Sequence, residues 1–152
     1  MDKLLEKYLE KHKILYKLHK HSAVFTVEQS KKEPLIEKIP GIRTKNLFLK
    51  DENKKFYLVS MAGEKRLDMC LLEVHLNVKH LEFGNAQELK EELNVIPGSV
   101  SIFTMTYAKT TRLIIDKDVF DAEIASFHPN INTETIELKH EDLKKFLNTL
   151  SC

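Results

Sequence analysis

The spacing of apolar residues predicts a helix at each end of the chain. Residues 2–12 repeat apolar side chains every three or four positions, with lysines and glutamates between them, which is typical of an amphipathic helix that packs on a core. The same repeat recurs near the end of the chain, on Leu143, Phe146, Leu147 and Leu150. We therefore expect both ends of the chain to cover part of the hydrophobic core.

Capping residues predict further helices inside the chain. A short polar side chain before an apolar segment accepts hydrogen bonds from the first free N–H groups of a helix, and a Glu or Gln three residues later completes a capping box. The patterns are Asp68 at the start of residues 68–76, Asn85 with Glu88 before a helix through Leu93, and Thr26 with Gln29 before a short helix that Pro34 limits.

Runs of β-forming residues predict a series of short strands. The clearest is a hairpin, in which residues 44–51 form one strand, a polar turn follows at 51–54, and residues 56–59 form the partner. Pro129 favours an extended conformation at the residue before it, His128, where another strand ends. The remaining predicted strands are at residues 14–21, 81–84, 112–116 and 133–138, and residues 97–103 have the composition of a turn followed by a strand.

These helices and strands do not alternate regularly, and the chain contains no internal repeat and no low-complexity linker. A chain of 152 residues is long enough to bury a core of its own. We therefore predict a single α+β domain over residues 1–152, built on a curled mixed β-sheet.

The composition is typical of a globular protein outside the membrane. Hydrophobic residues make up 42 % and charged residues 31 %, and no apolar run approaches the ~20 residues of a bilayer-spanning helix. The chain does not start with the pattern of a signal peptide, so we expect a cytoplasmic location and no membrane partner. Cys70 and Cys152 lie far apart, which favours reduced thiols over a disulfide framework.

Charge is distributed unevenly, although the net charge is only +1. Residues 1–66 contain 16 Lys or Arg and 9 Asp or Glu, a net of +7, whereas residues 67–152 contain 8 and 14, a net of −6. A basic face that meets a polyanion would produce this asymmetry, and so would solvated surface lysines.

Several common catalytic motifs are absent. The chain has no G-x-S-x-G motif, and its nearest glycines, Gly84 and Gly98, are 14 residues apart, which excludes glycine-rich phosphate loops. His19 and His21 have a metal-like spacing, but no third ligand follows at a suitable distance. We therefore expect neither a metal nor another cofactor.

Three short segments remain as candidates for chemistry. Lys45 and Asn46 begin a predicted buried strand, where an ammonium needs an anionic or carbonyl partner unless it extends into solvent. The small residues at 98–101 either expose backbone N–H groups to an oxyanion or ester, or form a plain turn. The third segment is His128 with Pro129. These segments can meet only in the fold.

Together these segments resemble a known family. The residues that carry the resemblance follow in the family's order and spacing at 24–29, 40–51, 65–68, 81–83, 97–101 and 127–133. Over residues 4–150 the chain is similar to the freestanding prolyl-tRNA editing proteins of the YbaK and aminoacyl-tRNA synthetase-associated domain family. The Lys45-Asn46-Leu47-Phe48-Leu49 and His128-Pro129-Asn130 elements look most like the branch that acts on alanyl-tRNA(Pro).

The resemblance implies a fold, an activity and a site. The fold would be a barrel-like curled sheet surrounded by helices, and the activity would be cleavage of the ester in mischarged tRNA(Pro), without a metal. Lys45 would be the catalytic lysine, Asn46 would support it, and His128 would line the amino-acid pocket. A loop would hold the ester carbonyl through its backbone, at Gly98, Ser99, Val100, Ser101 and Ile102. The implied partners are the acceptor end of tRNA(Pro) and prolyl-tRNA synthetase, and we expect a monomer.

One departure from the family pattern leaves the substrate open. The loop of the family usually ends in proline, where this chain has Ile102, and the larger side chain would either narrow the pocket or point away from it. The alternatives are therefore a deacylase for another small amino acid (Ser, Thr, Cys or 2-aminobutyrate), or a non-catalytic module that binds tRNA or a synthetase.

Overall fold

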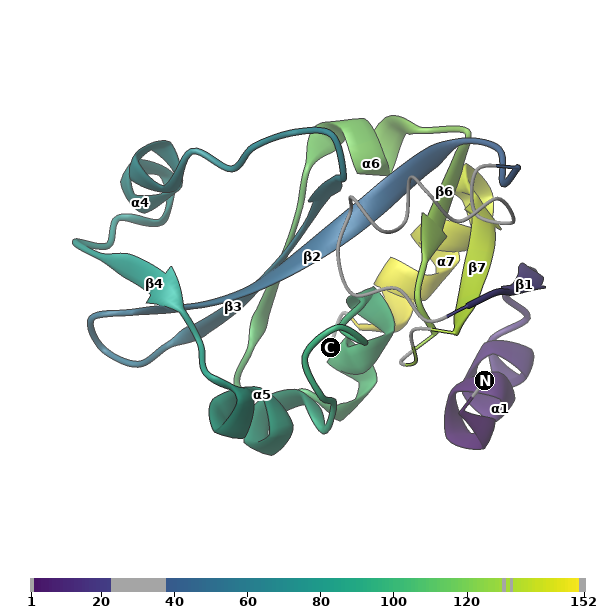
Figure 1. The fold of residues 1–152 in the computed structure, drawn as a ribbon, viewed down its shortest axis with the longest axis horizontal. Helices are drawn as coiled ribbons and strands as arrows, with labels where there is room; N and C mark the ends of the chain where they lie inside the picture. Colours follow the sequence, from purple (N-terminus) through teal and green to yellow (C-terminus); the bar gives the residue numbers. More distant parts are fainter. Residues whose placement is uncertain (1, 23–37, 130, 132, 151–152) are drawn as a thin grey trace.

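The computed structural model describes residues 2–22, 38–129, 131 and 133–150. In these residues seven strands form one mixed sheet, in the order β1-β7-β6-β2-β3-β5, with β4 paired to β2 (Figure 1). The strands are β1 (Lys17–Lys20), β2 (Ile42–Asp51), β3 (Phe56–Ala62), β4 (Leu81–Phe83), β5 (Arg112–Ile115), β6 (Ile124–Phe127) and β7 (Glu134–Lys139). The sheet is curled and not closed, which confirms the predicted α+β fold with a curled mixed sheet.

Five α-helices and one 3₁₀ helix accompany the sheet in the described residues. They are α1 (Lys3–Lys11), α4 (Met69–Leu76), α5 (Ala86–Leu93), α6 (Lys117–Asp121), α7 (His140–Thr149) and the 3₁₀ helix η1 (Ile102–Tyr107). Two of the three predicted caps are confirmed: Asp68 accepts a hydrogen bond from the N–H of Leu71, and Asn85 and Glu88 form a full capping box. None of these helices is long and apolar enough to cross a membrane.

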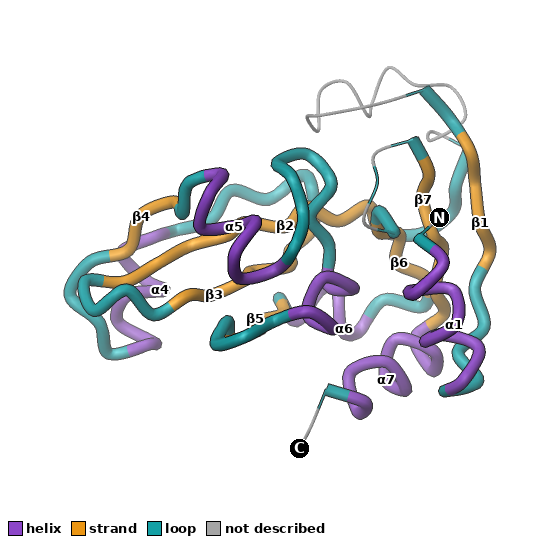
Figure 2. The backbone as a smooth tube through the Cα atoms, turned by 90° about the horizontal axis from the view of Figure 1, so that it is seen from below, coloured by secondary structure: helices purple, strands orange, loops and turns teal. Residues whose placement is uncertain are grey.

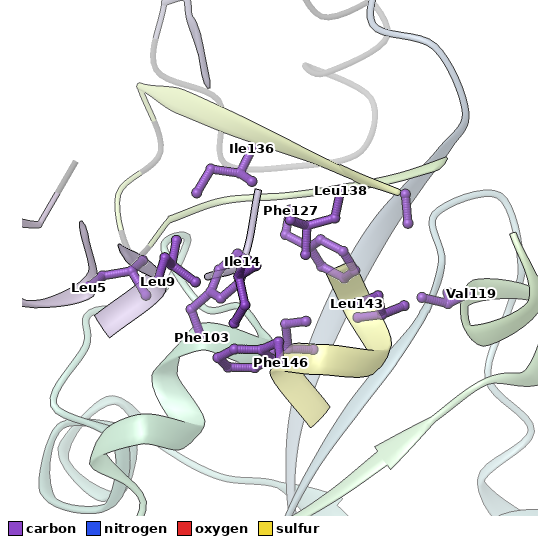
Figure 3. Close-up of a cluster of buried hydrophobic side chains, with 12 residues drawn as sticks. Leu5, Leu9, Ile14, Phe103, Val119, Phe127, Ile136, Leu138, Leu143 and Phe146 are labelled. Carbon is purple, nitrogen blue, oxygen red and sulfur yellow. The ribbon is translucent and has the colours of Figure 1, made fainter. Parts of the chain in front are cut away.

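The largest core cluster lies between the β1-β7-β6 part of the sheet and the two terminal helices. Figure 3 shows its side chains, and Figure 2 shows α1 and α7 together at this end of the molecule. Phe103 is fully buried at its centre, with its ring 5.8 Å from that of Phe127 and 5.0 Å from that of Phe146. The prediction that both ends of the chain cover the core is therefore confirmed.

The β2–β3 hairpin is covered on both faces. Alternate residues of a strand point to opposite faces, so Phe48 and Leu49 belong to different clusters. Phe48 packs with Leu89 and Leu93 of α5, whereas Leu49 packs with a cluster that includes side chains of α4. Residues on opposite faces of β2 therefore face different parts of the molecule.

The sheet interleaves the two halves of the sequence. Strands β1, β2 and β3 come from the basic half, and each of them pairs in the sheet with at least one strand from the acidic half: β1 with β7, β2 with β6 and β4, and β3 with β5. The difference in charge between the halves therefore does not by itself form a separate basic face.

Two secondary-structure predictions were wrong. Residues 99–103 do not form a strand, because local hydroxyl groups bond to the backbone and start η1 instead. Ser101 Oγ accepts from the N–H of Phe103 at 3.1 Å, and Thr104 Oγ1 donates to the Ser101 carbonyl at 2.6 Å. The strand predicted at 14–21 is limited to β1, because the N–H of Ile14 still bonds to Leu9 at the end of α1.

The sequence did not predict α6, whose five residues are too few to show a helical repeat. The capping-box prediction for Thr26 and Gln29 lies outside the described residues.

Candidate active site

Lys45 lies inside β2 and not at its start, because the strand begins at Ile42. The residue pairs with Met61 of β3, and its side chain is partly buried. The ammonium donates a hydrogen bond to the main-chain carbonyl of Lys65, in the turn after β3. The sequence left open whether this ammonium has a partner or extends into solvent. In the structure it has a carbonyl partner.

Asn46 points to the other face of the sheet. Its Nδ2 donates to the carbonyl of Val100 at 3.4 Å, so its amide is the link between β2 and the loop at 98–102. Its Oδ1 is buried without a hydrogen-bond partner, and so is the Oγ of Ser60, which lies opposite Asn46 on β3. Buried polar atoms usually have partners, so this pair is an unusual feature of the site.

The loop at 98–102 is held in place largely by its own backbone. Gly98 has φ +91°, a conformation that favours glycine, and the N–H of Ser99 bonds to the Ile96 carbonyl at 3.2 Å. Ser99 and Ser101 are buried. The loop is thus a well-packed turn, with the Val100 carbonyl directed at Asn46.

Ile102 is fully buried and belongs to the large core cluster around Phe103. Of the two possibilities that its size raised, the structure therefore favours a side chain that points into the core.

His128 follows β6 directly. Its Nδ1 lies 3.0 Å from the carbonyl of Glu134, and because a carbonyl only accepts, Nδ1 carries the proton. Burial lowers the pKa of His128, and the neighbouring His21 lowers it further. The ring is therefore neutral near pH 7, with Nε2 as a hydrogen-bond acceptor.

His21 and Thr135 stand beside His128 and were not predicted as site residues. The rings of His21 and His128 are 6.2 Å apart, and His21 Nε2 is 2.7 Å from Thr135 Oγ1. His21 Nδ1 donates to the carbonyl of Ser22 at 2.7 Å, so Nε2 accepts from Thr135 in the neutral ring. The only sequence signal for His21 was its spacing from His19, which is typical of metal ligands.

His19 instead contacts Glu137, at 3.0 Å. Across the described parts of the chain, no three His, Cys, Asp or Glu side chains are arranged to hold a metal ion.

The topology relates the Lys45 and His128 segments. Strands β2 and β6 run parallel, and their pairing ends at Arg43 and Ser126. Thr44 Oγ1 then donates to the Ser126 carbonyl at 2.7 Å, after which the two strands diverge (Figure 1). Lys45 and His128 each lie two residues beyond the last pair.

Not all predicted residues share one face. Asn46 and the loop lie on the α5 side of the hairpin, and Lys45 lies on the α4 side with Leu47 and Leu49. In the described residues, no direct hydrogen bond joins His128 to Lys45. Lys45, Asn46 and His128 thus follow the point where β2 leaves β6, and Lys45 and Asn46 lie on opposite faces of the sheet.

The mixed α+β architecture with a curled sheet fits the class of editing domains. Residues 21–146 match the family model of the aminoacyl-tRNA editing domain, and the chain therefore belongs to this family. The family resemblance of the sequence motifs is confirmed.

Two relatives are similar over most of their length. The chain is 32 % identical to the prolyl-tRNA editing protein ProX of Acetoanaerobium sticklandii, over 91 % of this chain and 85 % of that protein. It is 30 % identical to prolyl-tRNA synthetase associated domain-containing protein 1 of Danio rerio, over 95 % of this chain and 80 % of that protein.

Solved structures share the fold at lower identity. A proposed trans-editing enzyme for prolyl-tRNA synthetase superposes with a TM-score of 0.74 at 16 % identity, over 96 % of this chain and 90 % of that one. At this identity the likeness concerns the fold alone.

Proposed function

We propose that this protein is an aminoacyl-tRNA deacylase that acts in trans on mischarged tRNA(Pro), with alanyl-tRNA(Pro) as its preferred substrate. Membership of the editing-domain family and the similarity to a prolyl-tRNA editing protein support the reaction class. The observation that carries the proposal is the position of Lys45. The residue lies within strand β2, and its ammonium donates a hydrogen bond to the main-chain carbonyl of Lys65.

The chemistry suits these groups. An aminoacyl ester is already activated, so catalysis requires positioning, charge stabilisation and a water molecule, and not a protein nucleophile. Water adds to the ester carbonyl, the bond to the ribose oxygen breaks, and that oxygen leaves with a proton. The neighbouring ribose hydroxyl can assist by orienting the water.

Lys45 is suited to bind the terminal nucleotide. An ammonium has three N–H donors, and the Lys65 carbonyl accepts one of them. The other two remain for the phosphate or the ester of the tRNA end, and Asn46 fixes the neighbouring loop through Val100. We assign Lys45 as the catalytic residue and Asn46 as the residue that holds the loop at 98–102, on the opposite face of β2.

His128 is suited to set the size of the amino-acid pocket. Its ring orientation is fixed by the bond to Glu134, and Thr135 and His21 pack the same region. A fixed ring can exclude proline by shape and admit alanine, which is the logic of a second sieve. A synthetase pocket separates amino acids that differ by one methylene by only ~1–3 kcal/mol, so alanine needs such a correction.

The test is a panel of alanyl-, seryl-, cysteinyl- and prolyl-tRNA(Pro) at sub-stoichiometric protein. We expect rapid loss of the alanyl ester and a stable prolyl ester. Preferred loss of the seryl or cysteinyl ester would keep the reaction and overturn the substrate assignment. Binding of tRNA without turnover of any ester would identify a non-catalytic binding module instead.

The size of the pocket is tested separately with His128→Ala. The smaller side chain should allow hydrolysis of prolyl-tRNA(Pro), which the wild type leaves intact. If His128→Ala loses alanyl activity and still rejects the prolyl ester, the assignment of His128 as the size filter is wrong.

A further inference from the structure

Lys65 lies in the turn between β3 and α4. Its main-chain carbonyl contacts Lys45, and its side-chain ammonium contacts two acidic residues. The main-chain carbonyl of Lys65 accepts a hydrogen bond from the Lys45 ammonium. The side-chain ammonium of Lys65 pairs with Asp116 at 3.1 Å and with Asp118 at 2.5 Å. Lys65 therefore contacts Asp116 and Asp118 through its side chain and Lys45 through its main chain.

The turn is also fixed at its base. The N–H of Gly63 donates to the Arg43 carbonyl at 2.9 Å, which ties the turn to β2 two residues before Lys45. The N–H of Asp116 donates to the Ser60 carbonyl at 2.9 Å, which ties the acidic residue to β3. Both partners of the ion pair are therefore anchored to the hairpin that carries Lys45.

The side chain of Asp116 does not make the hydrogen bond that is usual for its position in the helix. It is the N-cap of α6, where an aspartate typically accepts a hydrogen bond from the helix backbone, yet its side chain makes no such bond. Its carboxylate contacts Lys65 instead. The arrangement uses a capping residue to hold a side chain of the neighbouring turn.

Stability alone gives little reason for this contact. Lys65 is 46 % exposed and Asp118 is 52 % exposed, and ion pairs in such surroundings contribute little to folding. The ion pair does restrain the side chain of the residue whose main-chain carbonyl accepts from Lys45. A carbonyl in a fixed position determines the direction in which the remaining N–H groups of Lys45 point.

We propose that Lys65 is a positioning residue for Lys45: the ion pair with Asp116 and Asp118 fixes the turn, so that the Lys65 carbonyl orients the Lys45 ammonium toward the ester end of the tRNA. This rests on the proposed catalytic role of Lys45. Lys65 acts through Lys45 and does not touch the substrate.

The role predicts a specific kinetic pattern. Lys65→Met keeps the main-chain carbonyl and most of the side-chain length but removes the ion pair, so binding of tRNA should persist while the ammonium loses its orientation. We expect kcat on alanyl-tRNA(Pro) to fall about tenfold with KM within about twofold, since a small misplacement of a reacting group is costly. Lys65→Arg, which keeps a positive charge for both carboxylates, should restore most of kcat.

The matched control is Lys145→Met. Lys145 is a lysine on α7 that is also partly exposed and near a carboxylate, Asp142, at 3.9 Å. It lies outside the site, so its loss should leave kcat and KM unchanged. Equal kcat values for Lys65→Met and Lys145→Met would overturn the proposal, as would an equal loss with Lys65→Arg and Lys65→Met.

A second readout does not depend on activity. In protein labelled with ¹⁵N-lysine, the Nζ signal of Lys45, assigned by its loss in Lys45→Arg, should be distinct from that of free lysine side chains and should move toward them in Lys65→Met. If the wild type hydrolyses no ester, the proposed function fails; if Lys45→Ala keeps full deacylase activity, the catalytic role of Lys45 fails; in either case this signal still decides whether Lys65 orients the Lys45 ammonium. An unchanged Lys45 signal in Lys65→Met would contradict it.

Discussion

Lys45 and Asn46 are neighbours in β2, and their side chains leave the strand on opposite faces of the sheet. Lys45 donates to the Lys65 carbonyl on the α4 side, and Asn46 donates to the Val100 carbonyl on the α5 side. The two residues therefore connect one strand to two separate loops. Lys45 is the candidate for contact with substrate, whereas Asn46 fixes the loop at 98–102.

Asn46→Ala should reduce activity more than stability. The substitution removes a long hydrogen bond, 3.4 Å, together with a buried oxygen that has no partner, so the net change in the free energy of unfolding should stay below about 1 kcal/mol. Loss of the link to Val100 releases the loop, and we expect kcat/KM on alanyl-tRNA(Pro) to fall about tenfold. Urea unfolding and deacylation assays on one preparation measure both.

Ser60→Ala is the control for Asn46→Ala. Ser60 lies opposite Asn46 and also has a buried polar atom without a partner, but it makes no side-chain link to the loop. Its removal should leave activity unchanged and should not lower stability. Wild-type activity in Asn46→Ala, or equal losses in both variants, would contradict the role of the Val100 link.

His128 should make stability depend on pH in the acidic range. Burial lowers the pKa of His128 in the folded state below its ordinary value of about 6.5. The stabilising contribution is therefore complete above pH 6.5 and is lost as pH falls through the folded pKa, because the unfolded chain takes up the proton first. Between pH 7 and pH 5, wild type should lose more unfolding free energy than His128→Gln.

The control for His128→Gln is His75→Gln, on the exposed surface of α4. This variant should keep the pH dependence of the wild type, since the buried carboxylates are common to all three proteins. A pH dependence of His128→Gln equal to that of the wild type, measured by urea unfolding at pH 5 and pH 7, would show that His128 is not buried in its neutral form.

Gly41→Ala should destabilise the start of β2 severely. Gly41 has φ +87°, and a Cβ atom there would lie 2.3 Å from the main-chain oxygen of Ile124, where β6 begins. Because a backbone atom cannot move aside like a flexible side chain, we expect a loss of more than about 3 kcal/mol, among the larger effects of single substitutions. Thermal unfolding measures it.

Gly63→Ala is the matched substitution in a turn on the same hairpin. Gly63 does not have a positive φ, so alanine is compatible with its backbone. The free energy of unfolding should change by less than about 1 kcal/mol. Similar melting temperatures for the two variants would contradict the close approach of Gly41 to β6.

Local chemistry in the sequence predicted much of the fold. The hairpin of β2 and β3, the capping box at Asn85 and Glu88 and the terminal helix α7 all depend on signals within a few residues. The loop after Gly98 was predicted incorrectly, because the hydroxyl groups of Ser101 and Thr104 bond to their own backbone and outweigh the β-forming side chains near them.

The candidate site was predictable only in part. Lys45, Asn46 and His128 carry motif signals, but the partners that hold them lie far away in the sequence and become visible only in the fold. Lys65 is 20 residues from Lys45, and Val100 is 54 residues from Asn46. In both cases the acceptor is a backbone carbonyl, which is the same in every residue and leaves no trace in the side-chain pattern.

The central claim, that Lys45 carries the deacylase reaction, is tested most directly by Lys45→Ala against alanyl-tRNA(Pro) at sub-stoichiometric protein. The matched control is Lys144→Ala, a lysine on α7 outside the site. We predict that Lys45→Ala abolishes turnover while it keeps the fold, and that Lys144→Ala retains wild-type turnover. Wild-type hydrolysis by Lys45→Ala, or no hydrolysis by the wild type itself, would contradict the account.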